Sequence, residues 1–210
     1  MATDKLGLYN AALRLCKARA LANLNENVES RRVLDGVWAD DPVKYCLEQG
    51  QWQWASRAVK LSYSNSVAPD FGFQRAFEKP ADWVRLVAIS TDEYFTEAYN
   101  RFSDEAGFIF ADIDELYVKY VSDDVSYGRN YALWPKTFEQ YVTAFIASEA
   151  VGRLTDSDTT VDKLEDQVKR RLSAAQNFDG VNRPVAFPPR GTFVNARHGR
   201  FGMRYDDRRR

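Results

Sequence analysis

The spacing of apolar residues changes within residues 42–63, PVKYCLEQGQWQWASRAVKLSY. In the first part, Pro42 suits the first position of a helix and Gly50 suits the residue that ends one. In the last part, apolar residues alternate with polar ones, as in a strand with one buried face, at Val59, Leu61 and Tyr63. The chain is therefore predicted to pass from helix to strand at about residue 56.

Helices are predicted on both sides of this change. Before it, residues 4–20 place apolar side chains on one helix face. Residues 28–49 continue the helical repeat, as one helix that is kinked or restarted at Pro42. Beyond the strands, a largely buried helix begins after Pro135, and an amphipathic helix follows it.

The segment between these helices is rich in aromatic and β-branched residues. Three of its strand candidates, separated by turn residues, span residues 83–89, 108–113 and 116–122. The chain is therefore predicted to be mainly α with a β insertion, an α+β fold. A bundle of about four helices is expected in residues 1–182, with a small antiparallel sheet between helices two and three at about 56–123. Residues 183–210 are expected to form an extended C-terminal arm.

Composition limits the classes of protein that need to be considered. The 210 residues are 45% hydrophobic and 28% charged, close to globular averages, which favours a folded domain. No apolar run approaches the ~20 residues of a membrane-spanning helix, so no membrane partner is expected. Two cysteines, Cys16 and Cys46, are too few for a disulfide framework, and a reducing compartment such as the cytoplasm is expected.

Charge is distributed unevenly along the chain. Residues 183–210 hold eight arginines and two acids, a net charge of +6. The other 182 residues hold 21 basic and 28 acidic residues, a net charge of −7. The proline- and glycine-rich arm interleaves arginine with aromatic residues, a pattern found in docking segments and in some binders of single-stranded nucleic acid. A merely solubilising tail is the third interpretation.

Candidate chemical motifs fail on spacing or context. Asp156, Asp158 and Asp162 resemble a calcium loop, but the positions for its glycine and glutamate hold Val161 and Gln167. A turn with three acids at Asp112, Asp114 and Glu115 is more typical of a solvated hairpin than of a catalytic pair. His198 is the single histidine and lies among arginines and glycines of the arm. The sequence therefore predicts no enzyme, no cofactor and no metal site.

Two sets of residues remain as candidates for contacts with partners. The docking residues of the arm are expected to be Arg183, Phe187, Arg190, Phe193, Arg197, Arg200, Phe201, Arg204 and Tyr205. A second set consists of aromatic residues, most of which are expected in the sheet core because large aromatic side chains are usually buried. Its loop members are expected to anchor an interface. This set comprises Phe71, Phe73, Phe77, Tyr94, Phe95, Tyr99 and Phe102.

Several segments together carry a family resemblance. They are residues 8–13 (LYNAAL), 30–35 (SRRVLD), 52–55 (WQWA), 71–86 (FGFQRAFEKPADWVRL), 117–121 (YVKYV) and 134–135 (WP). In this order they resemble phage tail tubular protein A, the head-to-tail adaptor. The resemblance covers roughly residues 6–180, with Lys79 where leucine is commoner in the family. No motif in it is catalytic, so its specificity comes from the order of the segments.

The resemblance implies a structural virion protein of the phage neck or tail, made in the host cytoplasm. Twelve copies are expected to form a ring between the portal and the tail, with a central channel for the genome. The implied partners are the portal protein ring, the tail nozzle or other tail proteins, further copies of the chain, and double-stranded DNA in passing. An acidic lumen would repel the phosphates of that DNA. The arm is expected to dock on the portal, and the aromatic set to contact the tail or neighbouring subunits.

Two other functions remain open on the sequence. A nucleic-acid-binding accessory protein would use the arginines of the arm to bind phosphate, with an affinity that falls steeply with salt. An enzyme that uses the acids near residues 104–124 ranks last, because the sequence offers no substrate pocket for it.

Overall fold

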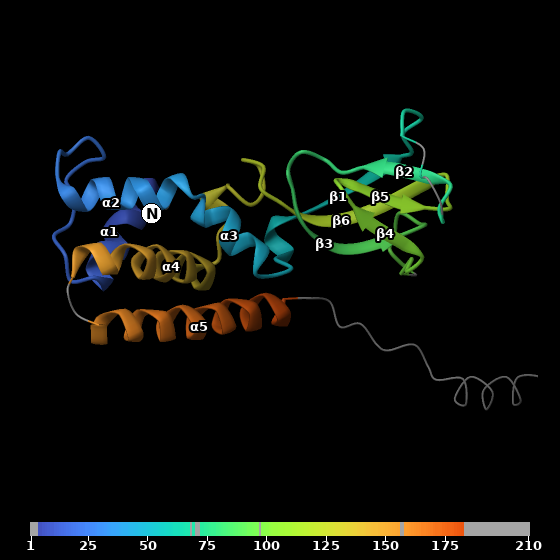
Figure 1. The fold of residues 1–210 in the computed structure, drawn as a ribbon. Coiled ribbons are helices and arrows are strands. Elements are labelled where there is room, and N and C mark those ends of the chain that lie inside the picture. The colour runs from blue at the N-terminus through green and yellow to red at the C-terminus, as the bar shows by residue number, and fades with distance from the viewer. Residues whose placement is uncertain (1–3, 68, 70–71, 97, 156–157, 183–210) are drawn as a thin grey trace, which may run out of the picture.

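The computed structural model describes residues 4–67, 69, 72–96, 98–155 and 158–182. Within them, five helices and two three-stranded antiparallel sheets follow the order helices, strands, helices. The helices lie at one end of the molecule and the strands at the other (Figure 1). The prediction of about four bundled helices with one small sheet is therefore wrong, because the strands form a second unit with its own core.

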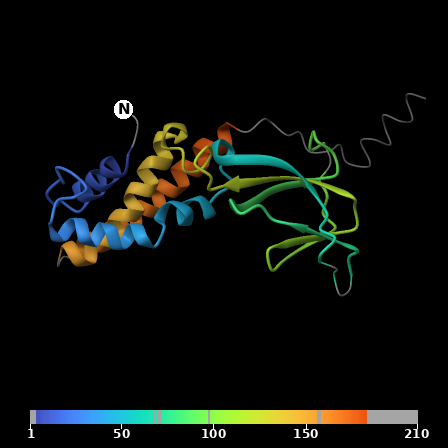
Figure 2. The same ribbon diagram turned by 90° about the horizontal axis from the view of Figure 1, so that it is seen from above.

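The helical unit is organised around one buried helix. Helix α4 (Lys136–Leu154) packs against α1 (Lys5–Leu15), α2 (Glu29–Ala39), α3 (Pro42–Glu48) and α5 (Asp158–Val181). Figure 1 shows α4 between α5 on one side and α1, α2 and α3 on the other, and Figure 2 shows α4 and α5 side by side. Nine of the nineteen residues of α4 are buried, which explains the nearly continuous apolar character of its sequence.

The predicted helix over 28–49 is two helices because of Asp41. Its backbone φ is +53°, a left-handed conformation that interrupts the helical path between α2 and α3. The Asp41 carboxylate accepts a hydrogen bond of 3.3 Å from the backbone N–H of Lys44, and Pro42 occupies the first helical position. The expectation that Pro42 restarts the helix was right in position, but the change in direction makes α3 a separate element.

The β unit contains two sheets. One has the strand order β1 (Ser56–Ser62), β6 (Glu115–Ser122), β3 (Trp83–Ser90), and the other β2 (Arg75–Glu78), β5 (Phe108–Ala111), β4 (Phe102–Glu105). Side chains from both sheets form the second core: Phe77, Ile89, Ile109, Ala111, Leu116, Val118 and Tyr120. Strand β4 was not predicted, because its sequence FSDE is too polar to look like a strand. It forms an edge of its sheet.

Strand β6 connects the two cores. Leu116, Val118 and Tyr120 project into the second core, whereas Val121, on the opposite face, belongs to the first core among the helices. Strand β3 also contributes to both cores: Ile89 belongs to the second core, and Val84 packs against the helical core. Two register shifts against β6 interrupt its regular pairing. The helical unit and the β unit are thus joined by shared strands as well as by the chain connections at η1 (Gln53–Ala55) and η2 (Tyr131–Leu133).

Candidate interaction surfaces

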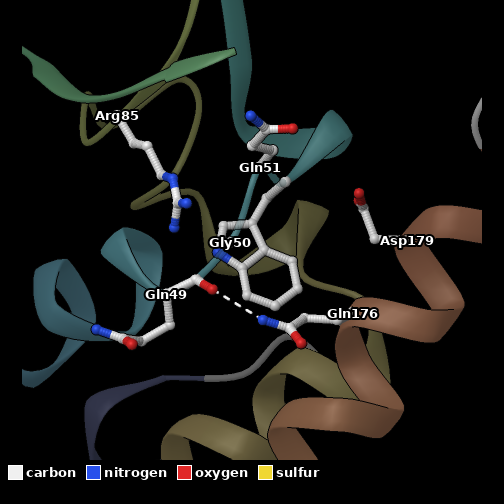
Figure 3. A pocket seen from close by; sticks show the side chains of 7 residues that line it. Gln49, Gly50, Gln51, Arg85, Gln176 and Asp179 are labelled. Atoms are coloured by element: carbon white, nitrogen blue, oxygen red, sulfur yellow. Dashed lines mark hydrogen bonds between the residues drawn. The ribbon is translucent and has the colours of Figure 1, made fainter.

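A pocket of about 370 Å³ lies where α3, β3 and α5 meet. Its lining residues are Gln49, Gly50, Gln51, Trp52, Arg85, Gln176 and Asp179. Gln176 and Asp179 project from α5, and Arg85 approaches from the other side (Figure 3). The pocket therefore marks the boundary between the helical unit and the β unit.

Hydrogen bonds to the backbone account for the polar walls of this pocket. Arg85 Nη1 donates to the carbonyl of Glu48 at 2.7 Å, and Gln176 Nε2 donates to the carbonyl of Gln49 at 2.9 Å. The buried Asp179 accepts from the backbone N–H of Gln53 at 2.8 Å. These bonds fix the end of α3 to both β3 and α5. The arrangement orients the two units and contains no nucleophile next to a general base.

A charged link on the loop before α4 strengthens the same boundary. Arg129 pairs with Asp41 at the start of α3 and, at 3.4 Å, with Asp123 at the end of β6. Burial raises the pKa of Asp41, but the hydrogen bonds from Arg129 and Lys44 outweigh it and hold the pKa below its usual value. Asp41 is therefore ionised at neutral pH, and Arg129 connects both units through carboxylates.

A groove runs between α2, α3 and α4. Its smaller hollow, about 70 Å³, is lined by Val37, Asp40, Pro42, Tyr45, Phe145 and Glu149. The larger hollow, about 280 Å³, shares Val37, Asp40 and Glu149 and adds Arg32, Val33, Gly36 and Arg153. Tyr45 stacks on Phe145 with 4.5 Å between ring centroids, yet 45% of Tyr45 stays exposed. We call these residues the α2–α4 groove.

An exposed aromatic residue stands on the loop after β3. Tyr94 is 78% exposed. The loop is built around Asp92, whose Oδ2 accepts hydrogen bonds from the backbone N–H and the hydroxyl of Thr96 at 3.2 and 2.7 Å. Phe95 has a left-handed φ of +54°, which completes the turn. Tyr94 is thus presented to solvent by a loop with several internal bonds.

The predicted aromatic set is divided by the structure. Phe77 is completely buried in the second core, so a partner cannot reach it. Tyr99 and Phe102 are half-buried and pack against that core, and Phe73 and Phe95 are also half-buried. Tyr94 alone of the described members is largely exposed. Phe71 and all the docking residues of the arm, from Arg183 to Tyr205, lie outside the described residues.

The acids considered for catalysis are paired with basic residues. Asp112 lies 3.2 Å from Arg101, Asp114 pairs with Arg75, and Glu115 lies 2.6 Å from Lys60. They surround the turn from β5 to β6, but the hairpin interpretation is wrong, because β5 and β6 belong to different sheets. Among the described residues, no group of three or more histidine, cysteine or acidic side chains is placed to hold a metal ion. No helix in the described part of the chain is both long and apolar enough to span a bilayer.

The α2–α4 groove was not found from the sequence, although one signal for it was present. Val43, Cys46 and Leu47 form the buried side of α3, which leaves Tyr45 on another face of that helix. A large aromatic residue away from the apolar stripe indicates a contact that the core does not use. Its partner Phe145 could not be assigned without the packing of α3 on α4.

Compared with known protein families and with curated proteins, the chain matches none.

Proposed function

We propose that the protein is a head-to-tail adaptor of a phage virion, a subunit of a ring between portal and tail. The observation that supports this most directly is the arrangement of two units end to end, with the β unit inserted between α3 and α4 (Figures 1 and 2). The segments that resemble tail tubular protein A fall in both units. A ring subunit needs two lateral faces and contacts above and below, which an elongated subunit with two cores offers.

Two further observations favour a structural role. Hydrogen bonds along the walls of the pocket between the units link the end of α3 to β3 and the following turn to α5, which favours a fixed relative orientation of the two units. The chain outside the arm carries a net charge of −7, so a channel lined by it would repel the phosphates of passing DNA. The arginines of the arm are proposed to dock on the portal, and Tyr94 to contact the tail or a neighbouring subunit.

Light scattering on mixtures with purified portal rings tests this function. We expect twelve copies to bind each portal, and we expect weak binding to free DNA. Deletion of residues 183–210 should abolish portal binding. The circular dichroism spectrum of the deleted chain should still show the helices and strands of the fold. Undiminished portal binding by the deleted chain would contradict the role of the arm.

The alternative is a nucleic-acid-binding accessory protein that uses the arginine-rich arm. It predicts that the free protein binds DNA with an affinity that falls steeply as salt is raised. Failure to bind any portal, together with salt-sensitive DNA binding, would replace the adaptor function by this one.

A further inference from the structure

The α2–α4 groove stays open because of a glycine that the fold does not need. Gly36 lies inside α2, where glycine costs roughly 0.5–1 kcal/mol relative to alanine. A Cβ added there would meet nothing within 4 Å, so no close approach of another element requires glycine. The missing side chain instead leaves room in the larger hollow of about 280 Å³, which is far more than one water molecule occupies.

The groove combines an exposed aromatic floor with unpaired negative charge. Tyr45 and Phe145 stack at its smaller hollow, where the charged lining residues within the described part of the chain are Asp40 and Glu149. Neither carboxylate forms an ion pair or a side-chain hydrogen bond with another described residue. An occupant with an aromatic ring and a guanidinium group would satisfy both features, because carboxylates bind arginine through paired hydrogen bonds.

The basic side chains of the groove lie at its larger hollow, which Asp40 and Glu149 also line. Arg32 and Arg153 line the larger hollow only. Arg32 already donates to Asn27 at 2.8 Å and lies 3.5 Å from Glu29, so its charge is directed away from Asp40. We therefore expect a cation to bind at the smaller hollow, which has no basic residue among its described lining, and the rest of a bound segment to occupy the larger hollow.

We propose that the α2–α4 groove binds the chain's own C-terminal arm, residues 183–210. The arm places aromatic residues next to arginines, as in Arg200-Phe201 and Arg204-Tyr205. Its net charge of +6 complements the two free carboxylates of the groove. The bound segment sets an aromatic ring beside the Tyr45–Phe145 stack and an arginine against Asp40 and Glu149.

The position of α5 makes this contact reachable within one chain. The arm follows α5, and Gln176 in the last turns of α5 donates to the carbonyl of Gln49, just after α3, the helix that carries Tyr45. The 28 residues of the arm reach at most about 100 Å when extended. Because a short tether gives a millimolar effective concentration, binding within the chain dominates at micromolar protein.

This contact goes beyond the proposed function and does not depend on it. It concerns the free protein, before any partner is present. A partner that uses the arm would first have to displace it from the groove, so the groove keeps the basic arm away from other acidic surfaces. Experiments on the isolated full-length chain test the contact without a portal.

Photo-crosslinking of the full-length chain provides the test. p-Benzoylphenylalanine replaces Phe193 or Phe201, and the crosslinked peptides are identified by mass spectrometry. We expect crosslinks mainly to peptides from α2, α3 and the middle of α4. Gly36→Leu, which fills the larger hollow, and the double variant Asp40→Lys with Glu149→Lys should each lower the crosslink yield at least fivefold.

Matched controls separate groove binding from general effects. Gly152→Leu makes the same change at another helical glycine with open space, on α4 but outside the groove. Glu165→Lys with Asp166→Lys makes the same change of charge at two exposed acids of α5. Both controls should leave the crosslink yield unchanged. Equal losses in groove and control variants, or crosslinks spread over the whole surface, would overturn the proposal. Crosslinks found only between light and ¹⁵N-labelled copies would overturn binding within one chain.

Discussion

The hydroxyl of Tyr120 donates a hydrogen bond of 3.0 Å to the carboxylate of Asp82, which places a charged group at the end of the second core. Tyr120 lies in the central strand β6, and Asp82 lies in the turn just before β3. The same carboxylate accepts hydrogen bonds from Ser122 and, at 3.0 Å, from Arg57 on β1. One carboxylate thus connects all three strands of the sheet β1-β6-β3.

Replacement of Asp82 by asparagine should destabilise the protein at neutral pH. Burial raises the pKa of Asp82, but the hydrogen bonds from Ser122, Arg57 and Tyr120 outweigh it and hold the pKa below its usual value. We expect Asp82→Asn to lower the free energy of unfolding by about 1.5–3 kcal/mol at pH 7, the range for hydrogen bonds to a charged group. Urea unfolding monitored by tryptophan fluorescence measures the change.

The pH dependence of this difference follows from the sign of the pKa shift. The carboxylate contributes its stability above its unfolded pKa of about 3.9, and the contribution is lost as the pH falls through the lower folded pKa. The gap between the wild-type chain and Asp82→Asn should therefore shrink below about pH 4. The exposed Glu93→Gln serves as the control and should change little at any pH. A gap that is constant down to acid pH would contradict this account.

Gly128 should not tolerate even one added carbon atom. It lies at the boundary of the two units, where a Cβ would stand 2.3 Å from the carbonyl oxygen of Ser122 and 2.8 Å from Leu47 Cδ1. Its own carbonyl accepts a hydrogen bond of 2.8 Å from the indole N–H of Trp134. We expect Gly128→Ala to lower the free energy of unfolding by about 1–3 kcal/mol, as overpacking does.

The measurement for Gly128→Ala is chemical denaturation, followed separately through the helical and the strand signals. Because Gly128 touches both units, both signals should shift to lower denaturant concentration together. Gly72→Ala makes the same change in a loop of the β unit, where a Cβ would meet nothing within 4 Å. Its φ of +84° strains alanine without a packing clash, so a loss of roughly 1–2 kcal/mol is expected there, confined to the strand signal. Gly128 has no left-handed φ, so a Gly128→Ala variant as stable as the wild-type chain would contradict the close-packing account.

The sequence predicted local elements better than their assembly. The alternation around Val59 located β1, and the apolar stretch after Pro135 located α4, because each element repeats its own burial pattern. A kink or restart at Pro42 was predicted, but the separation into two helices was not, since the left-handed backbone of Asp41 leaves no mark in an apolar repeat. Two sheets were not expected either, because strand pairing depends on contacts between distant residues such as Phe77 and Ile109.

The candidate surfaces also depend on contacts between residues that are far apart in the sequence. Sequence alone placed Phe77 with the interface candidates, although its position in β2 points it into the second core. The α2–α4 groove needs residues from three helices, of which α4 lies about a hundred positions along the chain from α2. No local pattern contains that spacing. The charge of the arm, by contrast, could be read directly from composition.

Alanine in place of Gly36 should stabilise the fold. The position is helical, and the added methyl group meets no atom within 4 Å, so the gain in helix propensity is not offset by a clash. We expect Gly36→Ala to raise the free energy of unfolding by about 0.5–1 kcal/mol. Gly152→Ala, in a similar setting on α4, should give a gain of similar size. Destabilisation by Gly36→Ala in thermal unfolding would mean that the backbone at this position is not helical in solution.

Alanine variants of Phe77 and Tyr94 should have different effects: one should lower stability, and the other should weaken binding to a partner. Phe77→Ala removes a fully buried ring from the second core and should cost about 3–5 kcal/mol of unfolding free energy. Tyr94→Ala removes a ring that is 78% exposed, so its unfolding free energy should stay within about 0.5 kcal/mol of the wild-type value. If Tyr94 is an anchor of the proposed assembly, the same variant should bind a tail protein or a neighbouring subunit at least tenfold more weakly. Glu93→Ala, at the adjacent exposed position, is the control for the loop. Equal binding by the wild-type chain and Tyr94→Ala would exclude this loop from the interface and leave the fold unaffected.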